Sequence, residues 1–148
     1  MRTFSELMNL QGRTALITGG AGNIGQAVAE TLIELGSRVA IVDKDEDACQ
    51  DRADSLGKNA TPLTCDLTSE EATRETICMA IKLFGRLDIL LHCAAYVGTS
   101  QVSGWAVPFD QQTVSAWDSA LRVNLTSAFV MAQEAREALS VSGHGSII

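Results

Sequence analysis

The chain has 148 residues, of which 46% are hydrophobic and 20% are charged, and its formal net charge is -7. This length and this composition predict one globular domain with a substantial core, and they exclude a disordered or fibrous chain. The negative charge argues against binding to nucleic acid or to an anionic membrane, and it favours a small-molecule partner.

Residues 1–10 contain no continuous apolar run, so we expect no secretory signal there, and no segment approaches the ~20 apolar residues of a membrane-spanning helix. A cytoplasmic location is therefore expected. The four cysteines lack the spacing of a zinc site or of a disulfide framework. Cys49, Cys65, Cys78 and Cys93 are therefore interpreted as reduced thiols in the core. No metal site is predicted.

The first predicted strand covers residues 14–17, and a glycine-rich turn with the pattern GxxGxxG follows it directly, from Gly19 to Gly25. A helix follows, with Ile24, Val28, Leu32 and Leu35 on its buried face and Gly36 at its end. Glycines at such a turn let the backbone approach a pyrophosphate, and the helix N-terminus offers free N–H groups. The sequence predicts dinucleotide binding here, and the alternative is a glycine-rich turn without a ligand.

The second predicted strand, residues 39–42, ends at Asp43, which lies 18 residues after Gly25. An acidic residue at this spacing binds the hydroxyls of the adenosine ribose. Its charge would repel a 2′-phosphate, and no arginine lies in the glycine turn, so NAD is predicted in preference to NADP, although Lys44 weakens the preference. The alternative is that Asp43 only caps the next helix.

The remaining elements continue the alternation of strands and helices that is typical of a parallel sheet. Their predicted ranges are a helix over 45–56, a strand around 63–65, a helix that begins with a Thr68–Glu71 capping box and ends at Gly85, a strand over 89–91, a loop over 96–112 that contains Gly98, a long helix over 114–139 with Trp117 in the core, and a strand from Ser146 at the end of the chain.

In this order the motifs resemble those of the short-chain dehydrogenase/reductase family. Cys65-Asp66-Leu67 resembles the pair that contacts adenine, His92-Cys93-Ala94-Ala95 takes the place of the family's Asn-Asn-Ala-Gly, and Asn124 resembles the asparagine that helps hold a water in the proton relay. The resemblance implies that Asn124 is a catalytic residue, and the alternative is a hydrogen-bonded structural asparagine. It implies a cofactor site at Gly19, Gly22, Asn23, Ile24, Gly25, Asp43, Asp66, Leu67, Cys93, Ala94 and Ala95.

The resemblance implies a Rossmann-type α/β fold, which is a doubly wound parallel sheet in the order 3-2-1-4-5 with helices on both faces. Residues 1–148 would form one NAD(P)-binding domain, truncated at the fifth strand. The implied activity is NAD-dependent hydride transfer with an alcohol or ketone, in a homo-oligomer, either a dimer or a tetramer. The family's catalytic Ser, Tyr and Lys are not recognisable, because Ser100 lies four residues after the only tyrosine, Tyr96. The chain alone is therefore predicted to be inactive.

Two further interpretations stay open. Asn23 in the glycine turn and the Ala94-Ala95 pair resemble the extended branch of the family, which includes sugar-nucleotide epimerases and dehydratases, whereas the residues after Asn124 favour the classical branch. The other possibility is a non-catalytic NAD-binding module.

Overall fold

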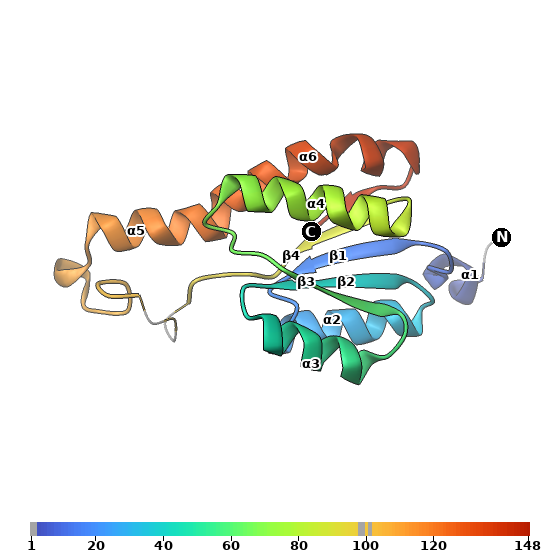
Figure 1. Ribbon diagram of the computed structural model, residues 1–148, viewed down its shortest axis with the longest axis horizontal. Helices are drawn as coiled ribbons and strands as arrows, with labels where there is room; N and C mark the ends of the chain where they lie inside the picture. The colour runs from blue at the N-terminus through green and yellow to red at the C-terminus, as the bar shows by residue number, and fades with distance from the viewer. Residues whose placement is uncertain (1–2, 98–99, 101) are drawn as a thin grey trace.

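The computed structural model describes residues 3–97, 100 and 102–148 (Figure 1). The strands are β1 (Thr14–Thr18), β2 (Arg38–Asp43), β3 (Ala60–Thr64), β4 (Ile89–His92) and β5 (Ser146–Ile147). The helical elements are α1 (Phe4–Met8), α2 (Asn23–Glu34), α3 (Glu46–Leu56), α4 (Glu70–Phe84), the 3-10 turn η1 (Phe109–Gln111), α5 (Val114–Leu121), the π turn η2 (Arg122–Thr126) and α6 (Ser127–Val141).

The strands form one parallel sheet in the order β3-β2-β1-β4-β5, which confirms the predicted topology. Thr18 at the end of β1 is in register with Val42 of β2 on one side and with His92 of β4 on the other. The chain passes outward from β1 through β2 to β3 and then returns to the other side of β1. The order therefore reverses between β1 and β4, and in such sheets the carboxyl ends of the strands beside the reversal form the ligand crevice.

Alternating side chains along the strands divide the core into two layers. Leu16, Val42 and Leu90 pack against α4 and α6, whereas Ile17 and Ile41 pack against α2 and α3. Figure 1 shows these two pairs of helices on opposite faces of the sheet. The predicted arrangement of helices on both faces is thus confirmed.

The predicted buried face of α2 is confirmed for Val28 and Leu32, which are partly buried and pack against the core, and it is wrong for Ile24. Ile24 is 73% exposed, and Gly25 and Ala29 are the residues that the helix buries against the sheet. A Cβ atom on Gly25 would collide with the carbonyl oxygen of Gly19. The helix begins so close to the preceding turn that only small residues fit on its inner face, and the larger apolar residues are displaced to its sides.

The residues that cap α3 and α4 differ from those that the sequence motifs predicted. Ser69, and not Thr68, caps α4 by accepting from the N–H of Ala72 at 3.2 Å, so the predicted capping box is wrong. Asp45 caps α3 by accepting from the N–H of Ala48, so Asp43 is not the cap of that helix. Cys78 lies on the exposed side of α4, which corrects its predicted place in the core.

The long helix predicted over 114–139 consists of three pieces, because the π turn η2 separates α5 from α6. Trp117 was expected in the core, yet it is 53% exposed and contacts Trp105 with ring centroids 6.2 Å apart. The reason is that α5 extends beyond the edge of the sheet (Figure 1) and has no layer of strands beneath it. Gly98 of the predicted loop lies outside the described residues.

The short helix α1 was not predicted, although Thr3 and Glu6 form a capping box at its start.

Among the described residues, no helix combines the length and the apolar character needed to cross a membrane.

Candidate functional site

The turn between β1 and α2 is fixed by contacts with two neighbouring strands. The N–H of Gly20 donates to the carbonyl of Val42 at 3.0 Å, and the N–H of Gly22 donates to the carbonyl of Gly19 at 3.1 Å. Gly19 has a φ of 63°, and a Cβ atom there would lie 2.7 Å from the backbone nitrogen of Ala94. Both the left-handed backbone and the close approach of the segment after β4 therefore require glycine.

The N-terminus of α2 differs from those of the helices around it. Its N-cap residue, Gly22, provides no side chain to accept from the first turn, whereas Asp45, Ser69 and Thr113 cap α3, α4 and α5. Within the described part of the chain, no side chain takes that place at α2. The N–H groups of its first turn and the partial positive charge of the helix end remain available to an anionic group such as a phosphate.

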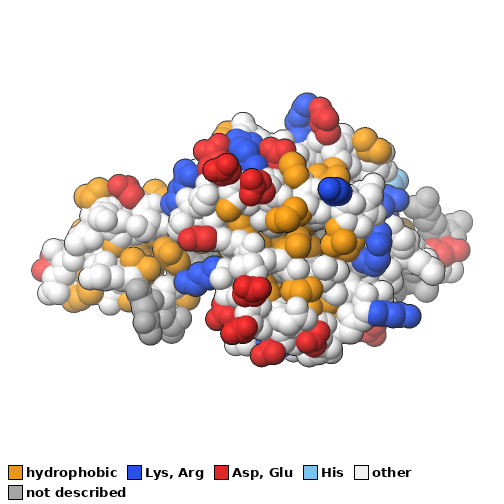
Figure 2. All heavy atoms as spheres, viewed as in Figure 1, with side chains coloured by type: hydrophobic (Ala, Val, Ile, Leu, Met, Phe, Trp, Pro, Cys, Tyr) orange, Lys and Arg blue, Asp and Glu red, His pale blue; other side chains and the backbone are white. Residues whose placement is uncertain are grey.

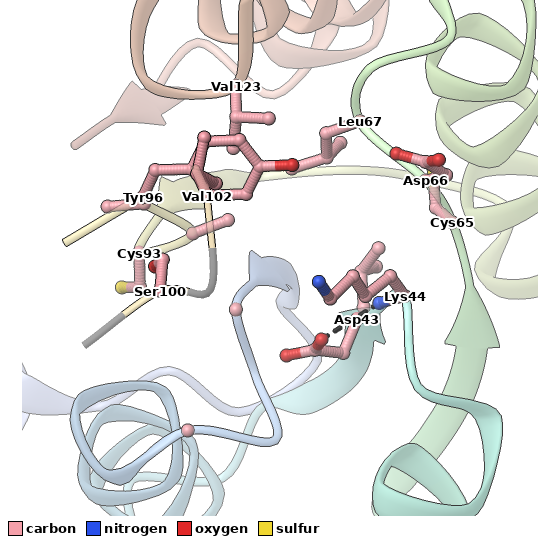
Figure 3. Close-up of a pocket in the computed structure, with 15 residues that line it drawn as sticks. Asp43, Lys44, Cys65, Asp66, Leu67, Cys93, Tyr96, Ser100, Val102 and Val123 are labelled. Atoms are coloured by element: carbon pink, nitrogen blue, oxygen red, sulfur yellow. Dashed lines mark hydrogen bonds between the residues drawn. The ribbon is translucent and has the colours of Figure 1, made fainter. Parts of the chain in front are cut away.

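A pocket of about 380 Å³ lies beside this helix end, at the carboxyl ends of β1, β2, β3 and β4 (Figure 3). Its volume falls in the range of small-molecule sites. The predicted cofactor residues that line it are Gly19, Gly22, Asp43, Asp66, Leu67, Cys93, Ala94 and Ala95. The other residues of the pocket wall are Val42, Lys44, Cys65, Tyr96, Ser100, Val102 and Val123.

The other predicted site residues lie outside this pocket. Asn23 and Ile24 line a shallow groove on the outer side of α2, together with Val28 and Leu32. Gly25 is buried beneath the turn. Asn124 lies in η2 behind the pocket wall, next to Val123.

Two carboxylates lie at the ends of adjacent strands. Asp43 is the last residue of β2. Its side chain accepts from the N–H of Lys44 at 2.8 Å, and its carbonyl accepts from the N–H of Cys65 at 2.8 Å. Asp66 accepts from the N–H and the hydroxyl of Thr68 at 2.9 and 2.8 Å. In both residues the hydrogen bonds within the described chain use only Oδ1, so Oδ2 can accept from a ligand hydroxyl.

The cysteines at the site are protonated thiols. Burial raises the pKa of Cys65 and of Cys93, which line the pocket. Behind the pocket, burial and then the charge of Asp43 raise the pKa of Cys49 to about 11. A thiol with a raised pKa is a poor nucleophile, so these residues act as small apolar groups. Across the described residues, no three His, Cys, Asp or Glu side chains are arranged to hold a metal ion.

His92 and Asn124 connect η2 to the end of β4. The two ring nitrogens of His92 lie 2.9 Å from the hydroxyl of Thr18 and 3.1 Å from the carbonyl oxygen of Val123. Asn124 accepts from the N–H of Tyr96 at 2.7 Å and donates to the carbonyl of Tyr96 at 3.1 Å. The side-chain amide thus fixes the backbone of the one tyrosine, whose side chain extends into the pocket in Figure 3.

Arg52 contacts the glycine turn, although the sequence does not indicate a role for it. It lies on α3, and its Nη2 donates to the carbonyl of Ala21 in the glycine turn at 3.2 Å. Its Nε is buried and has no hydrogen-bond partner among the described residues. The only sequence signal was its place on the same side of α3 as the buried Cys49 and Ala53. The glycine turn, which contains no arginine of its own, therefore has a guanidinium beside it.

Comparisons with known proteins agree with this architecture. A family model described as short chain dehydrogenase matches residues 13–148. The chain is 38% identical over 128 residues to the rhamnolipids biosynthesis 3-oxoacyl-(acyl-carrier-protein) reductase of Pseudomonas aeruginosa, covering 85% of the chain and 47% of the reductase. It is 30% identical over 142 residues to the D-threitol dehydrogenase of Mycolicibacterium smegmatis, covering 94% of the chain and 52% of that enzyme.

A solved structure, NAD+-bound xylitol dehydrogenase, matches with a TM-score of 0.82 and 29% identity, covering 93% of this chain and 52% of that one. The chain thus spans about half the length of the relatives that it matches.

Proposed function

This chain belongs to the short chain dehydrogenase family of oxidoreductases, and from this premise we propose that it binds NAD for hydride transfer to or from an alcohol or ketone. The observation that carries the proposal is the uncapped N-terminus of α2 beside a pocket whose rim holds Asp43. NAD, when bound, supplies the group that accepts or donates the hydride. The chain's own residues bind and orient it.

The residues present fit a dinucleotide. We assign the diphosphate to the first turn of α2, with Gly19, Gly22, Asn23, Ile24 and Gly25 contributing backbone, and the adenosine ribose to Asp43. Asp66 and Leu67, at the end of β3, are assigned to the adenine. Cys93, Ala94 and Ala95 follow β4 and are assigned to the nicotinamide end of the cofactor. Their side chains are small, which leaves room for the ring.

NAD is proposed in preference to NADP because of the charge at the ribose position. A 2′-phosphate would approach the carboxylate of Asp43. Lys44 also lines the pocket, and Arg52 contacts the glycine turn, so the repulsion is partly offset. We therefore propose a preference for NAD rather than complete exclusion of NADP.

The remaining parts of the proposal concern the whole protein. The named relatives, a 3-oxoacyl reductase and sugar-alcohol dehydrogenases, support an alcohol or ketone as the substrate. Asn124 is proposed to hold a water of the proton relay, since its amide retains one hydrogen and one lone pair beyond its bonds to Tyr96. The chain has no Tyr-x-x-x-Lys pair, so we expect no turnover from these 148 residues alone. The cytoplasmic location stays a prediction.

Thermal unfolding with each cofactor tests the proposal. NAD is expected to raise the Tm of the protein more than NADP at the same concentration, and Asp43→Ala should narrow the difference because it removes the charge that disfavours the 2′-phosphate. Asp51→Ala, which changes an exposed carboxylate of α3, is the matched control and should leave the difference unchanged.

Three outcomes would contradict parts of the proposal. An equal rise in the Tm of the unchanged protein with NAD and with NADP would contradict the role of Asp43 in cofactor preference. Protection by neither would disprove the dinucleotide site. Protection by NAD without oxidation of any alcohol by the complete protein would instead support a non-catalytic NAD-binding module.

A further inference from the structure

His92 is the last residue of β4, and its ring bridges two elements that are distant in the sequence. Nδ1 lies 2.9 Å from the hydroxyl oxygen of Thr18, at the end of β1. Nε2 lies 3.1 Å from the carbonyl oxygen of Val123, in η2. The imidazole therefore spans from the carboxyl edge of the sheet, where the pocket lies, to the π turn.

The two partners determine which nitrogen of the ring carries the proton. A carbonyl oxygen can only accept, so Nε2 must donate to Val123, and in the neutral ring Nδ1 must then accept from the hydroxyl of Thr18. Burial lowers the pKa of His92 more than the bond to Val123 raises it, which favours the neutral ring. The Thr18 oxygen also accepts from the N–H of Ala94 at 3.4 Å. The three hydrogen bonds thus form a chain in which Ala94 donates to Thr18, Thr18 donates to His92 and His92 donates to Val123.

The carbonyl of Val123 lies where the helix departs from regular hydrogen bonding. In an α-helix it would accept from the N–H of Ser127, but in η2 that N–H donates to the carbonyl of Arg122. The Val123 carbonyl accepts instead from the hydroxyl of Ser127 at 2.6 Å and from His92. Two side chains thus support this carbonyl.

The next residue of the π turn makes the second link to the pocket. Asn124 binds both the N–H and the carbonyl of Tyr96, four residues after His92 in the chain. Among the described residues, this amide pair is the only other polar link between the π turn and the segment after β4. His92 and Asn124 thus make two neighbouring links between the π turn and the chain at and after the end of β4.

We propose that His92 is a positioning residue whose neutral, Nε2-protonated ring holds the π turn at residues 122–126, and with it Asn124 and Tyr96, against the cofactor edge of β1 and β4. The role for the cofactor rests on the proposed function. The structural link does not, because it joins residues of this chain only.

Nitrogen NMR of the imidazole and a pair of amide variants test the proposal without a cofactor. The ring should be neutral at pH 7 with its hydrogen on Nε2. A glutamine amide reaches about as far as Nε2 and an asparagine amide only as far as Nδ1. His92→Gln should therefore retain the bond to Val123 and His92→Asn should lose it. Exchange of the Tyr96 N–H should rise about tenfold in His92→Asn and clearly less in His92→Gln.

His144→Gln is the matched control, since the other histidine of the chain is exposed, and it should leave the exchange of Tyr96 unchanged. A hydrogen on Nδ1, a charged ring at pH 7, or equal exchange of Tyr96 in the two His92 variants would overturn the proposal. The NMR result requires only the unchanged protein, so a variant that fails to fold does not affect it. The protein could fail to bind NAD while His92 has the expected tautomer and the Tyr96 N–H exchanges as expected. That result would contradict the proposed function and leave the positioning role of His92 intact.

Discussion

Two glycines at the junction of β1 and α2, the N-cap residue Gly22 and Gly25 in the first turn of the helix, have different surroundings. Around Gly25, a Cβ atom would collide with the carbonyl of Gly19 and would lie 2.6 Å from the Cα of Gly20, so backbone would have to move. Around Gly22, whose φ is -77°, the nearest atom to a Cβ would be the Gly19 oxygen at 3.3 Å, and the residue lines the pocket. One glycine therefore serves the packing of the fold, and the other leaves room at the site.

The two alanine variants should separate these roles. Gly25→Ala is expected to lower the free energy of unfolding by about 1–3 kcal/mol, because it overpacks the turn. Gly22→Ala should change it by less than about 1 kcal/mol and should weaken NAD binding, because its methyl group occupies the pocket wall. Urea unfolding without cofactor and calorimetric titration with NAD measure the two effects. Similar losses of stability in both variants would contradict this distinction.

Single residues also show what the sequence could not reveal. Asp43 and Asp66 could be assigned because strand ends are visible in the sequence and each acid directly follows one. Arg52 could not, because its contact with Ala21 depends on how α3 packs beside α2, and nothing in the local pattern of α3 specifies that distance. The contact of His92 with Val123 was equally hidden, since the two residues are 31 positions apart.

At the scale of elements, the segment before β4 joins three strands at the edge opposite the pocket. Asp88, which is 1% exposed, accepts from the N–H of Thr14 at 2.9 Å and from two nitrogens of Arg86 at 2.8 and 2.6 Å. Its backbone carbonyl accepts from the N–H of Ser146 at 2.9 Å. The carboxylate thus fixes the start of β1 beside β4, and its backbone fixes β5.

This carboxylate should make stability depend on acid pH. Burial raises the pKa of Asp88, but the hydrogen bonds and the charge of Arg86, with the N–H of Thr14, outweigh it, so the pKa is below the usual 3.8. A lowered folded-state pKa means that the stabilisation is fully present above the unfolded value and is lost as the pH falls through the folded value. Asp88→Asn should cost about 1–3 kcal/mol at pH 7 and progressively less below pH ~4.

Urea unfolding of both proteins between pH 7 and pH 2.5 measures the effect. Asp51→Asn, at an exposed site, should cost little at any of these pH values. A cost of Asp88→Asn that stays constant down to the lowest pH would contradict the assignment of the lowered pKa to this group.

The elements differ in how far the sequence predicts them. Strands β1, β2 and β4 are continuous apolar runs bounded by polar residues, and Gly36 and Gly85, with φ of 102° and 76°, end α2 and α4 as expected. The π turn could not be predicted, because one extra residue in a turn leaves the spacing of Leu121, Leu125 and Phe129 compatible with a regular helix. Its cause is tertiary, since partners in β4 and after it bind its backbone and side chain.

At the scale of the whole molecule, the alternation of strands and helices predicted a parallel sheet, and the resemblance of the motifs to a known family implied its strand order. It did not predict where the sheet ends relative to the last helices. Figure 1 shows α5 and the preceding segment extending from the body, so residues with the spacing of a buried helix face are exposed. The spacing of apolar residues indicates that one face of a helix becomes covered, but it does not indicate which element or molecule covers it.

An apolar stripe runs along α5, η2 and α6 and consists of Val114, Trp117, Leu121, Leu125 and Phe129, which are 77%, 53%, 37%, 63% and 62% exposed. Hydrophobic side chains are also visible on the extending part in Figure 2. A contiguous exposed patch of this kind is typical of a protein interface. We propose that the stripe is a contact between two copies of this protein, because a second copy would present the same surface in return.

Sedimentation equilibrium of the protein tests this expectation. The unchanged protein should associate to a dimer or tetramer, and Phe129→Glu should shift it toward the monomer, because a buried carboxylate without a partner opposes the contact. Leu83→Glu adds the same charge at an exposed apolar residue of α4, outside the stripe, and should leave the association unchanged. Since both sites are exposed, neither variant should alter the thermal stability of the monomer by much. A protein that is monomeric without substitution, or a Leu83→Glu variant that dissociates as readily as Phe129→Glu, would contradict a contact between two copies through the stripe.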